Sequence, residues 1–313
     1  MSRILKVAAA QLGPIALDEP RSSAVGRMIA LLQNAKAQGA ELVIFPELAL
    51  TTFFPRWYTE DQSEIDKYFE TEMPNKDTEP LFAEARKLKI GFNFGFAELV
   101  VEKRVTRHFN TAIIVDQQGR IAAKYRKIHL PGHTENEPWR AFQHLEKRYF
   151  EKGNLGFQVH QVFGGKIGMC ICNDRRWPET FRVMGLQGVE LVALGYNTPT
   201  LNSLKDDESA ETRMHHNHLC MQAGAYQNAC WVVGTAKAGD EDGFDLMAGS
   251  CIVNPDGEIV ALAQTAEDEL IAFNCDLDEC AFLKRTTFDF AAHRRVEHYG
   301  RICSQTSAEP PPE

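Results

Sequence analysis

The sequence predicts an α/β fold, because one pattern of buried strand, amphipathic helix and buried strand occurs twice along the chain. The pattern occupies residues 7–14, 21–38 and 41–47, and again residues 166–172, 178–187 and 189–195. A strand, a helix and a strand in this order are typical of a parallel βαβ unit. We therefore predict two similar units within one α/β domain.

The joints between helix and second strand support the comparison of the two units. They read QGAELVIF at 38–45 and QGVELVAL at 187–194. Gly39 is suited to close the first helix as its C-cap. No fixed period continues along the chain, so a solenoid repeat is not expected.

The remaining elements fit a mixed sheet system. We expect strands at 90–99, 110–116 and 229–236, hairpins over 110–130 and 250–263, and a long helix at 206–227 that carries Met214, Leu219, Met221 and Tyr226 near one stripe. No Gly/Ser-rich linker divides the chain. Residues 1–303 are therefore predicted to form one domain, and 304–313, which read SQTSAEPPPE, a disordered tail.

Composition narrows the class of partner. The chain has 313 residues, 44% of them hydrophobic, and a formal net charge of −9. This content is enough for a sizeable core. We see no basic stretch that would neutralise phosphates, so nucleic acid is not an expected partner. An anionic substrate would need local cations, because the field of the whole protein repels it.

The cysteines and the apolar runs indicate a cytoplasmic protein. The eight cysteines form no pair of CxxC motifs, and several lie within apolar runs, as reduced thiols do. The first residues resemble a strand, and no run reaches the roughly 18 to 20 apolar residues of a membrane span. We expect no membrane association.

Cys172 is the first candidate for chemistry. It ends the predicted strand 166–172, just before a helix that Pro178 can begin. Unpaired backbone N–H groups at a helix start lower a cysteine pKa, so a thiolate is expected. Cys170 lies two residues earlier on the same face of the strand, and we expect it in the core. A buried, inert Cys172 is the alternative, although the polar loop 173–176 favours a site.

Glu47 and Lys127 are the other two candidates. Glu47 ends the apolar run LVIFPE, where its carboxylate could serve as a general base or remain a solvated loop acid. Lys127 shares a strand face with Tyr125 and His129. It could be a fixed donor to an oxyanion or a surface charge on an edge strand, and spacing alone does not decide.

Three segments together carry a resemblance to a known family. FPELALTTFFPRW contains Glu47, KYRKIHLPGH contains Lys127 and CICNDRRWPE contains Cys172. Together they resemble the Glu–Lys–Cys pattern of the nitrilase superfamily of carbon–nitrogen hydrolases. The segments TTFFPRW, YRKIHLPGH, FQHLEKRYFE, ICNDRRWPE and GYNTPT are similar to one subgroup, the N-carbamoyl-D-amino-acid amidohydrolases.

The resemblance implies a fold and four roles. The fold is a four-layer αββα sandwich, two mixed sheets flanked by helices, which pairs with further copies into a homodimer or homotetramer. Cys172 would be the nucleophile, Glu47 the general base and Lys127 the donor to the oxyanion. Glu146 would orient Lys127 and the substrate. No cofactor and no metal are implied.

The resemblance also implies a substrate, an N-carbamoyl-D-amino acid hydrolysed to the D-amino acid, carbon dioxide and ammonia. Arg175 and Arg176 would clamp its carboxylate, although a salt bridge to Glu179 is the alternative. The other substrate-binding positions implied are Asn173, His129, His144, Asn197 and Thr198. The roles of the 132–145 and 200–216 loops and the preferred side chain stay open.

Other functions remain as alternatives. The chain could be a different amidase, a nitrilase or a β-ureidopropionase-like enzyme of the same superfamily. His215, His216 and His218 could serve a metal hydrolase, although no Asp/Glu cluster completes such a site. A non-catalytic binding protein on the same scaffold is the third possibility.

Overall fold

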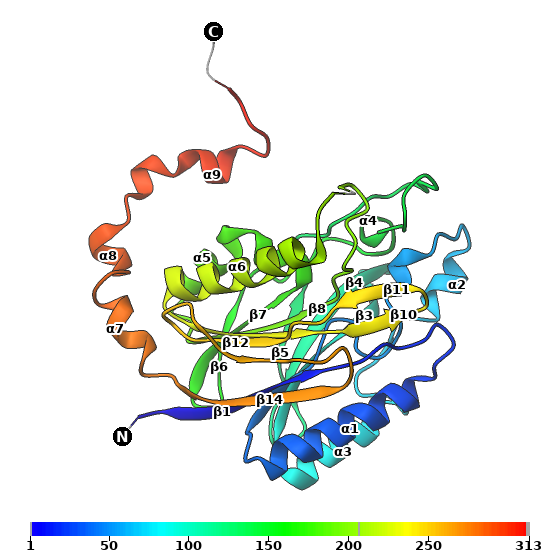
Figure 1. The fold of residues 1–313 in the computed structure, drawn as a ribbon, viewed down its shortest axis with the longest axis horizontal. Coiled ribbons are helices and arrows are strands. Elements are labelled where there is room, and N and C mark those ends of the chain that lie inside the picture. The colour runs from blue at the N-terminus through cyan, green and yellow to red at the C-terminus, as the bar shows by residue number, and fades with distance from the viewer. Residues whose placement is uncertain (1, 206, 311–313) are drawn as a thin grey trace.

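The computed structural model describes residues 2–205 and 207–310 and has four layers (Figure 1). Two six-stranded sheets pack face to face. Helices α1 (Arg21–Ala37) and α3 (Glu79–Leu88) cover one sheet, and α5 (Pro178–Leu186) and α6 (Ala210–Asn228) cover the other. The predicted sandwich of two mixed sheets flanked by helices is confirmed.

Both sheets have a parallel centre and antiparallel edges. The first runs in the order β14 (Glu269–Asp276), β1 (Ile4–Gln11), β2 (Leu42–Ile44), β3 (Gly91–Glu102), β4 (Val105–Val115), β5 (Ile121–Arg126). The second runs in the order β13 (Ile259–Leu262), β12 (Cys251–Val253), β9 (Trp231–Ala236), β8 (Leu191–Tyr196), β7 (Gly165–Ile171), β6 (Val159–Val162).

The two predicted βαβ units are present. β1 and β2 pair in parallel and are connected by α1, and β7 and β8 pair in parallel and are connected by α5. Gly39 and Gly188 hold matching left-handed conformations after the two helices, with φ of 84° and 79°. A residue with a Cβ is disfavoured there, which accounts for the glycine in both joints.

The cores follow from the strand patterns. Apolar side chains of β1, β2, β7, β8 and β9 meet between the sheets, and a second cluster lies between the first sheet and helices α1 and α3. Strands buried on both faces read as continuous apolar runs, as the sequence predicted for them.

Several boundaries and elements differ from the prediction. The long helix starts at Ala210 rather than at 206, because the Ser209 side chain caps it by accepting a hydrogen bond from the Thr212 N–H. Residue 206 lies outside the described residues. The hairpin of β10 (Ala238–Glu241) and β11 (Phe244–Met247) was not predicted, nor were α3 and β14.

The C-terminal segment leads away from the body of the molecule (Figure 1). It carries α7 (Cys280–Lys284), α8 (Phe290–His293) and α9 (Gly300–Ser304). Beyond α9 the described part of the predicted tail is largely exposed and forms no helix or strand, and residues 311–313 lie outside the described residues. The short helices α2 (Gln62–Asp66) and α4 (Glu146–Tyr149) lie in loops near the carboxyl ends of the strands.

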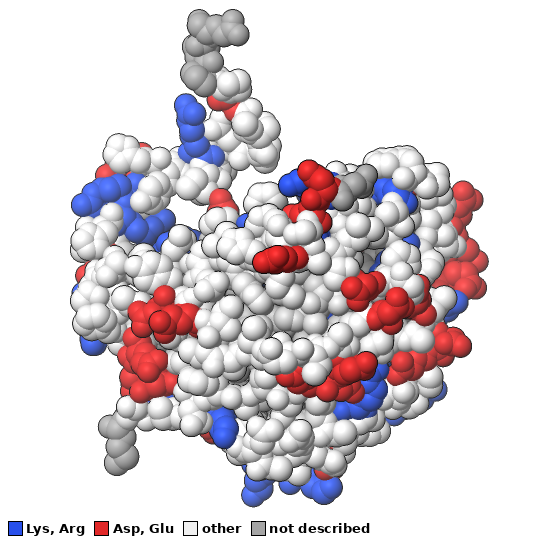
Figure 2. All heavy atoms as spheres, in the orientation of Figure 1, with Lys and Arg blue, Asp and Glu red and all other residues white. Residues whose placement is uncertain are grey.

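Surface charge agrees with the composition. Figure 2 shows acidic side chains in several clusters on the face drawn, while basic side chains lie singly or on the C-terminal segment. Of the helices in the described ranges, none combines the length and the apolar character that crossing a membrane requires.

Candidate active site

The site lies where the carboxyl ends of the central strands of both sheets meet. Glu47 follows β2 of the first sheet, and Cys172 follows β7 of the second. In α/β proteins ligand sites form at this end of the strands. Oxygens of Glu47 and Glu146 and the Cys172 sulfur all lie within 4.8 Å of one another.

A sharp backbone turn directs the Cys172 side chain. The strand ends at Ile171, and Cys172 begins a 3-10 helix over Cys172–Arg176 with φ of 48°. Positive φ is uncommon for a residue with a Cβ and often marks a functional site. The Cys172 thiol donates to the Asn197 carbonyl oxygen over 3.4 Å, and its residue is 2% exposed. Cys170 lies in the core, as expected.

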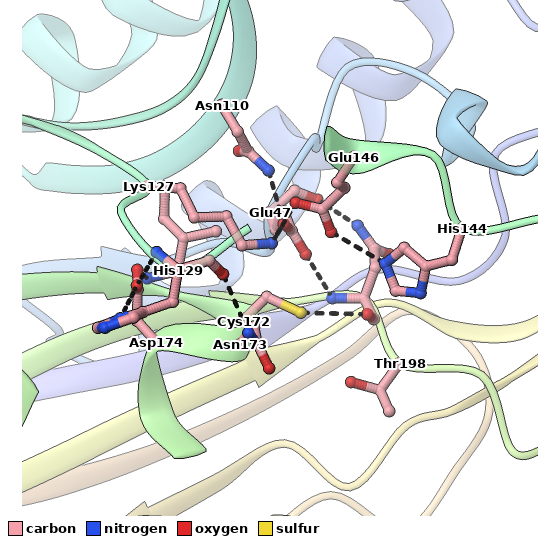
Figure 3. Close-up of polar contacts among 12 residues, drawn as sticks. Glu47, Asn110, Lys127, His129, His144, Glu146, Cys172, Asn173, Asp174 and Thr198 are labelled. Carbon is pink, nitrogen blue, oxygen red and sulfur yellow. Dashed lines mark hydrogen bonds and ion pairs between the residues drawn. The ribbon is translucent and has the colours of Figure 1, made fainter. Parts of the chain in front are cut away.

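Lys127 lies between the two glutamates (Figure 3). Its Nζ donates to Glu47 Oε1 over 2.7 Å and to Glu146 Oε2 over 2.6 Å. All three side chains are fully buried, so a surface role for Lys127 is excluded. β5 ends at Arg126, and the Lys127 N–H still bonds to the Asn110 carbonyl oxygen of β4, which fixes its backbone.

The Glu47 carboxylate is held on both oxygens. Asn110 Nδ2 donates to Oε1 over 2.7 Å, and the Asn197 N–H donates to Oε2 over 2.9 Å. Asn197 Nδ2 also donates to the Glu47 carbonyl oxygen. Asn110 was missed in the sequence, because an asparagine within a strand carries no pattern that marks it.

The electrostatics correct the expected thiolate. Burial and the Glu47 charge raise the pKa of Cys172, and Lys127 and Arg175 offset them only in part. The predicted lowering was wrong because the thiol is enclosed rather than exposed at a helix start. Burial lowers the Lys127 pKa, but the charges around it outweigh burial and raise it. Burial would raise the Glu146 pKa, but Lys127 and His144 lower it.

A cavity of about 330 Å³ opens at Cys172. Among the predicted substrate-binding residues it is lined by Arg176, His144, Asn197 and Thr198. Parts of the loops at 131–144 and 197–204, together with Glu208, form much of its wall. These loops include parts of the two segments whose roles the sequence left open.

The paired arginines occupy different surroundings. Arg176 is exposed at the cavity, and its Nη1 donates to Asn173 Oδ1 over 3.1 Å. Arg175 is buried and donates to the Cys172 carbonyl oxygen and to Thr198 Oγ1. Neither forms an ion pair with Glu179 or with another carboxylate of the described residues. Of these two adjacent arginines, only Arg176 therefore lines the cavity.

His129, His144 and Asn173 are bound to neighbours of the catalytic groups. His144 Nε2 lies 3.1 Å from Glu146 Oε1. His129 contacts Asp174 Oδ1 through its N–H and its Nδ1, both at 2.9 Å, and Asn173 Nδ2 donates to the His129 carbonyl oxygen. The buried Asp174 was not predicted, although it follows the nucleophile by only two residues.

Comparison with known proteins decides the family. The family model described as carbon-nitrogen hydrolase matches residues 6–285. The chain belongs to this family. It is thus a nitrilase-superfamily hydrolase that acts on carbon–nitrogen bonds other than peptide bonds.

Relatives within this hydrolase family cover most of the chain. An N-carbamoylputrescine amidase of Arabidopsis thaliana is 30% identical over 277 residues, 86% of each chain. A nitrilase of Pyrococcus abyssi is 28% identical and spans 95% of this chain and all of the relative. The crystal structure of a carbon-nitrogen hydrolase from Helicobacter pylori shares the fold, with a TM-score of 0.80, 22% identity, and coverage of 96% of this chain and 98% of that one.

The geometry does not favour metal chemistry in this hydrolase. Within the described ranges, the one cluster of three potential ligands is Glu47, Glu146 and Cys172, and the Lys127 ammonium already bonds to both of its carboxylates. His216 and His218 instead bond to Glu208 and to the Gly249 carbonyl oxygen. The histidines at 215–218 are therefore helix residues without a shared ligand set.

Proposed function

We propose that the protein hydrolyses N-carbamoyl-D-amino acids to the D-amino acid, carbon dioxide and ammonia. The proposal is supported by the buried Glu47–Lys127–Glu146–Cys172 cluster and by the resemblance of the motifs around it. The observation that carries the choice of an anionic substrate is the unpaired Arg176 at the cavity beside Cys172. Preference for the D form rests on the resemblance.

The cluster supports covalent catalysis in two stages. Glu47 takes the Cys172 thiol proton as sulfur attacks the carbamoyl carbon, and the oxyanion that forms is stabilised by the Lys127 ammonium. Collapse breaks the bond to the terminal nitrogen, which leaves as ammonia with the proton from Glu47. Water, deprotonated by Glu47, then attacks the thiocarbamate and restores the thiol. The released carbamate loses carbon dioxide to give the amino acid.

The charge of the cavity favours a carboxylate over an amine. Arg140, Arg176 and Arg213 line it, and Glu208 is the one carboxylate among its described lining residues. Glu208 already bonds to Arg213, Asn202 and His216. No free anion is thus available there for a cationic substrate such as N-carbamoylputrescine. Arg176 can bind a carboxylate through charge-assisted hydrogen bonds.

A product assay tests the substrate class. We would measure ammonia and amine release from D- and L-N-carbamoyl amino acids of one side chain, N-carbamoylputrescine, a nitrile and a simple amide. We expect the D-carbamoyl substrate to give the highest kcat/KM, and an alkylating agent to abolish turnover. Faster turnover of N-carbamoylputrescine, of the nitrile or of the simple amide would overturn the proposal.

The Cys172→Ala variant separates catalysis from binding. We expect it to lose turnover completely while it still binds the D-carbamoyl substrate in calorimetry, because Arg176 and the cavity wall remain. Arg176→Gln is the converse variant, for which we expect a KM raised about 10-fold or more, as for the loss of one charged hydrogen bond. Turnover by Cys172→Ala at the wild-type rate would rule out covalent catalysis at this residue.

We also propose that the chain assembles into a homodimer or homotetramer. The outer faces of α5 and α6 expose Val183, Leu186, Leu219 and Tyr226, of which the last two were predicted to lie near the helix's apolar stripe. The C-terminal segment carries further exposed apolar residues. Exposed apolar residues on adjoining elements are typical of an interface. Light scattering that gives a monomer mass at micromolar concentration would contradict this.

A further inference from the structure

We propose that Arg175 is a positioning residue that balances the charge of the buried catalytic centre and supports a thiolate at Cys172, rather than a ligand of the substrate. The inference rests on the proposed function only in taking Cys172 as the nucleophile. The two adjacent arginines then have different roles: Arg175 supports Cys172, and Arg176 binds the substrate carboxylate.

The first observation is that Arg175 is a buried cation that takes part in no ion pair among the described residues. The residue is 2% exposed, and no carboxylate in the described part of the chain lies within ion-pair distance of it. Its guanidinium lies over the Tyr196 ring, with its Cζ 4.6 Å from the ring centroid. Arginines are rarely buried unless they are paired. A buried, unpaired guanidinium at this position is therefore expected to stabilise a negative charge nearby.

The second observation is its attachment to the nucleophile. Nη1 donates to the Cys172 carbonyl oxygen over 2.6 Å, and Nη2 donates to Thr198 Oγ1 over 3.0 Å. One guanidinium thus joins the turn that carries the sulfur to the wall of the cavity. Both bonds hold backbone or side-chain oxygens in place, so two of its nitrogens are already committed to the protein.

The third observation is the charge count of the centre. Glu47 and Glu146 contribute two carboxylates, and Lys127, which bonds to both, contributes one ammonium. The trio alone would carry one excess negative charge in a buried site. A further negative charge on Cys172 would be strongly opposed there, because Coulomb interactions are large away from water. Arg175 adds a positive charge on the side of the sulfur's own backbone, while His144 bonds to Glu146.

The groups around both residues agree with this assignment. The charged groups that act on the Cys172 sulfur are Glu47, Lys127, Arg175 and Glu146; burial and the two carboxylates raise its pKa, and the two cations lower it. The titratable and charged groups that Arg175 faces are Cys170, Cys172, Arg176, Tyr196, His218 and Cys251. The buried carboxylate next to Arg175 in the sequence, Asp174, bonds to Tyr125, His129 and the Ile171 N–H, and no ion pair joins it to Arg175.

The arrangement gives a specific expectation for removal of the charge. A nearby opposite charge favours the charged form of a titrating group, and its removal shifts the pKa toward the neutral form. Without Arg175 the Cys172 thiolate should form at higher pH, and the fraction of reactive enzyme at neutral pH should fall about tenfold for each unit. Substrate binding should change little, because Arg175 does not line the cavity.

The experiment compares Arg175→Gln with the matched variant Arg176→Gln. The rate of Cys172 alkylation by iodoacetamide is measured from pH 6 to 11, together with kcat and KM for an N-carbamoyl-D-amino acid. For Arg175→Gln we expect the alkylation midpoint to rise by about one pH unit or more and kcat to fall about tenfold or more. For Arg176→Gln we expect an unchanged midpoint and a raised KM.

A third variant guards against loss of structure. Arg175→Lys keeps the charge but cannot make both hydrogen bonds, so we expect its alkylation midpoint to stay near the wild-type value while kcat falls. An unshifted midpoint in Arg175→Gln, or, if that variant does not fold, an upward shift of a full unit in Arg175→Lys, would overturn the proposal. Alkylation needs no substrate, so an error in the proposed substrate leaves this test intact.

Discussion

At the scale of single residues, Asn110 controls how the Glu47 carboxylate is presented. Its amide donates to the same oxygen, Oε1, that accepts from Lys127. Hydrogen bonds to charged groups contribute about 1.5–3 kcal/mol. We predict that Asn110→Ala lowers kcat about 10- to 100-fold with a nearly unchanged KM, because Asn110 does not line the cavity. Steady-state kinetics check this, and a raised KM at constant kcat would contradict it.

The sequence allowed the catalytic residues to be predicted, but not the residues that position them through hydrogen bonds. Cys172 and Glu47 each end an apolar run, Lys127 follows the strand 121–126, and the structure brings the three together. Asn110 and Asp174 look ordinary in the sequence, since their importance comes from which carboxylate or histidine the fold places opposite them. Arg175 and Arg176 look alike in the sequence for the same reason, although the fold buries the first and exposes the second.

At the scale of elements, two glycines let the strands close around Glu47. A Cβ on Gly95 of β3 would lie 2.8 Å from Glu47 Cα, and a Cβ on Gly195 of β8 would lie 2.5 Å from Glu47 N. Both contacts involve backbone, which cannot give way as a flexible side chain can. One strand from each sheet thus fixes the position of the general base.

We predict that Gly195→Ala moves Glu47 and lowers kcat by at least about 10-fold, because misplacement by 1 Å can cost up to 100-fold in rate. Kinetics and thermal unfolding are compared with Gly26→Ala in α1, where a Cβ would meet nothing within 4 Å. That control should keep full activity and unfold at the same or a slightly higher temperature, since alanine favours a helix. Full activity in Gly195→Ala would show that the close approach is dispensable.

Elements with a clear period were predictable, and those built by tertiary contacts were not. The helix at 21–38 and the two βαβ units follow from apolar spacing and from glycine at the joints. The β10–β11 hairpin has no such signal. It is stabilised by contacts with a distant segment: the Met247 N–H donates to the Thr198 carbonyl oxygen, and the Thr200 N–H donates to the Asp245 carbonyl oxygen.

At the scale of the whole molecule, several carboxylates are stabilised in their ionised form across distant segments. Arg126 and Lys124 outweigh burial and lower the Glu98 pKa, and Arg3 does so for Glu190. Lys237 and Arg56 outweigh burial at Glu241, whose carboxylate also accepts from the Ile15 and Phe53 N–H groups. The Glu241 contacts join the loop after β1, the loop after Glu47 and the β10–β11 hairpin, so the fold around the site depends on them.

The folded protein should therefore lose stability in acid. A carboxyl group whose folded pKa lies below its unfolded value stabilises the fold fully above the unfolded value and loses that contribution as pH falls through the folded one. With ordinary glutamate values of 4.5, we predict an unfolding midpoint in urea that is steady from pH 7 to 5 and falls progressively below about 4.5. Because the Glu98 and Glu241 pairs are buried, 0.5 M NaCl should leave this profile largely unchanged, whereas it would flatten one caused by exposed pairs. A midpoint that is constant from pH 7 to 3 would show that these carboxylates are not stabilised as the contacts imply.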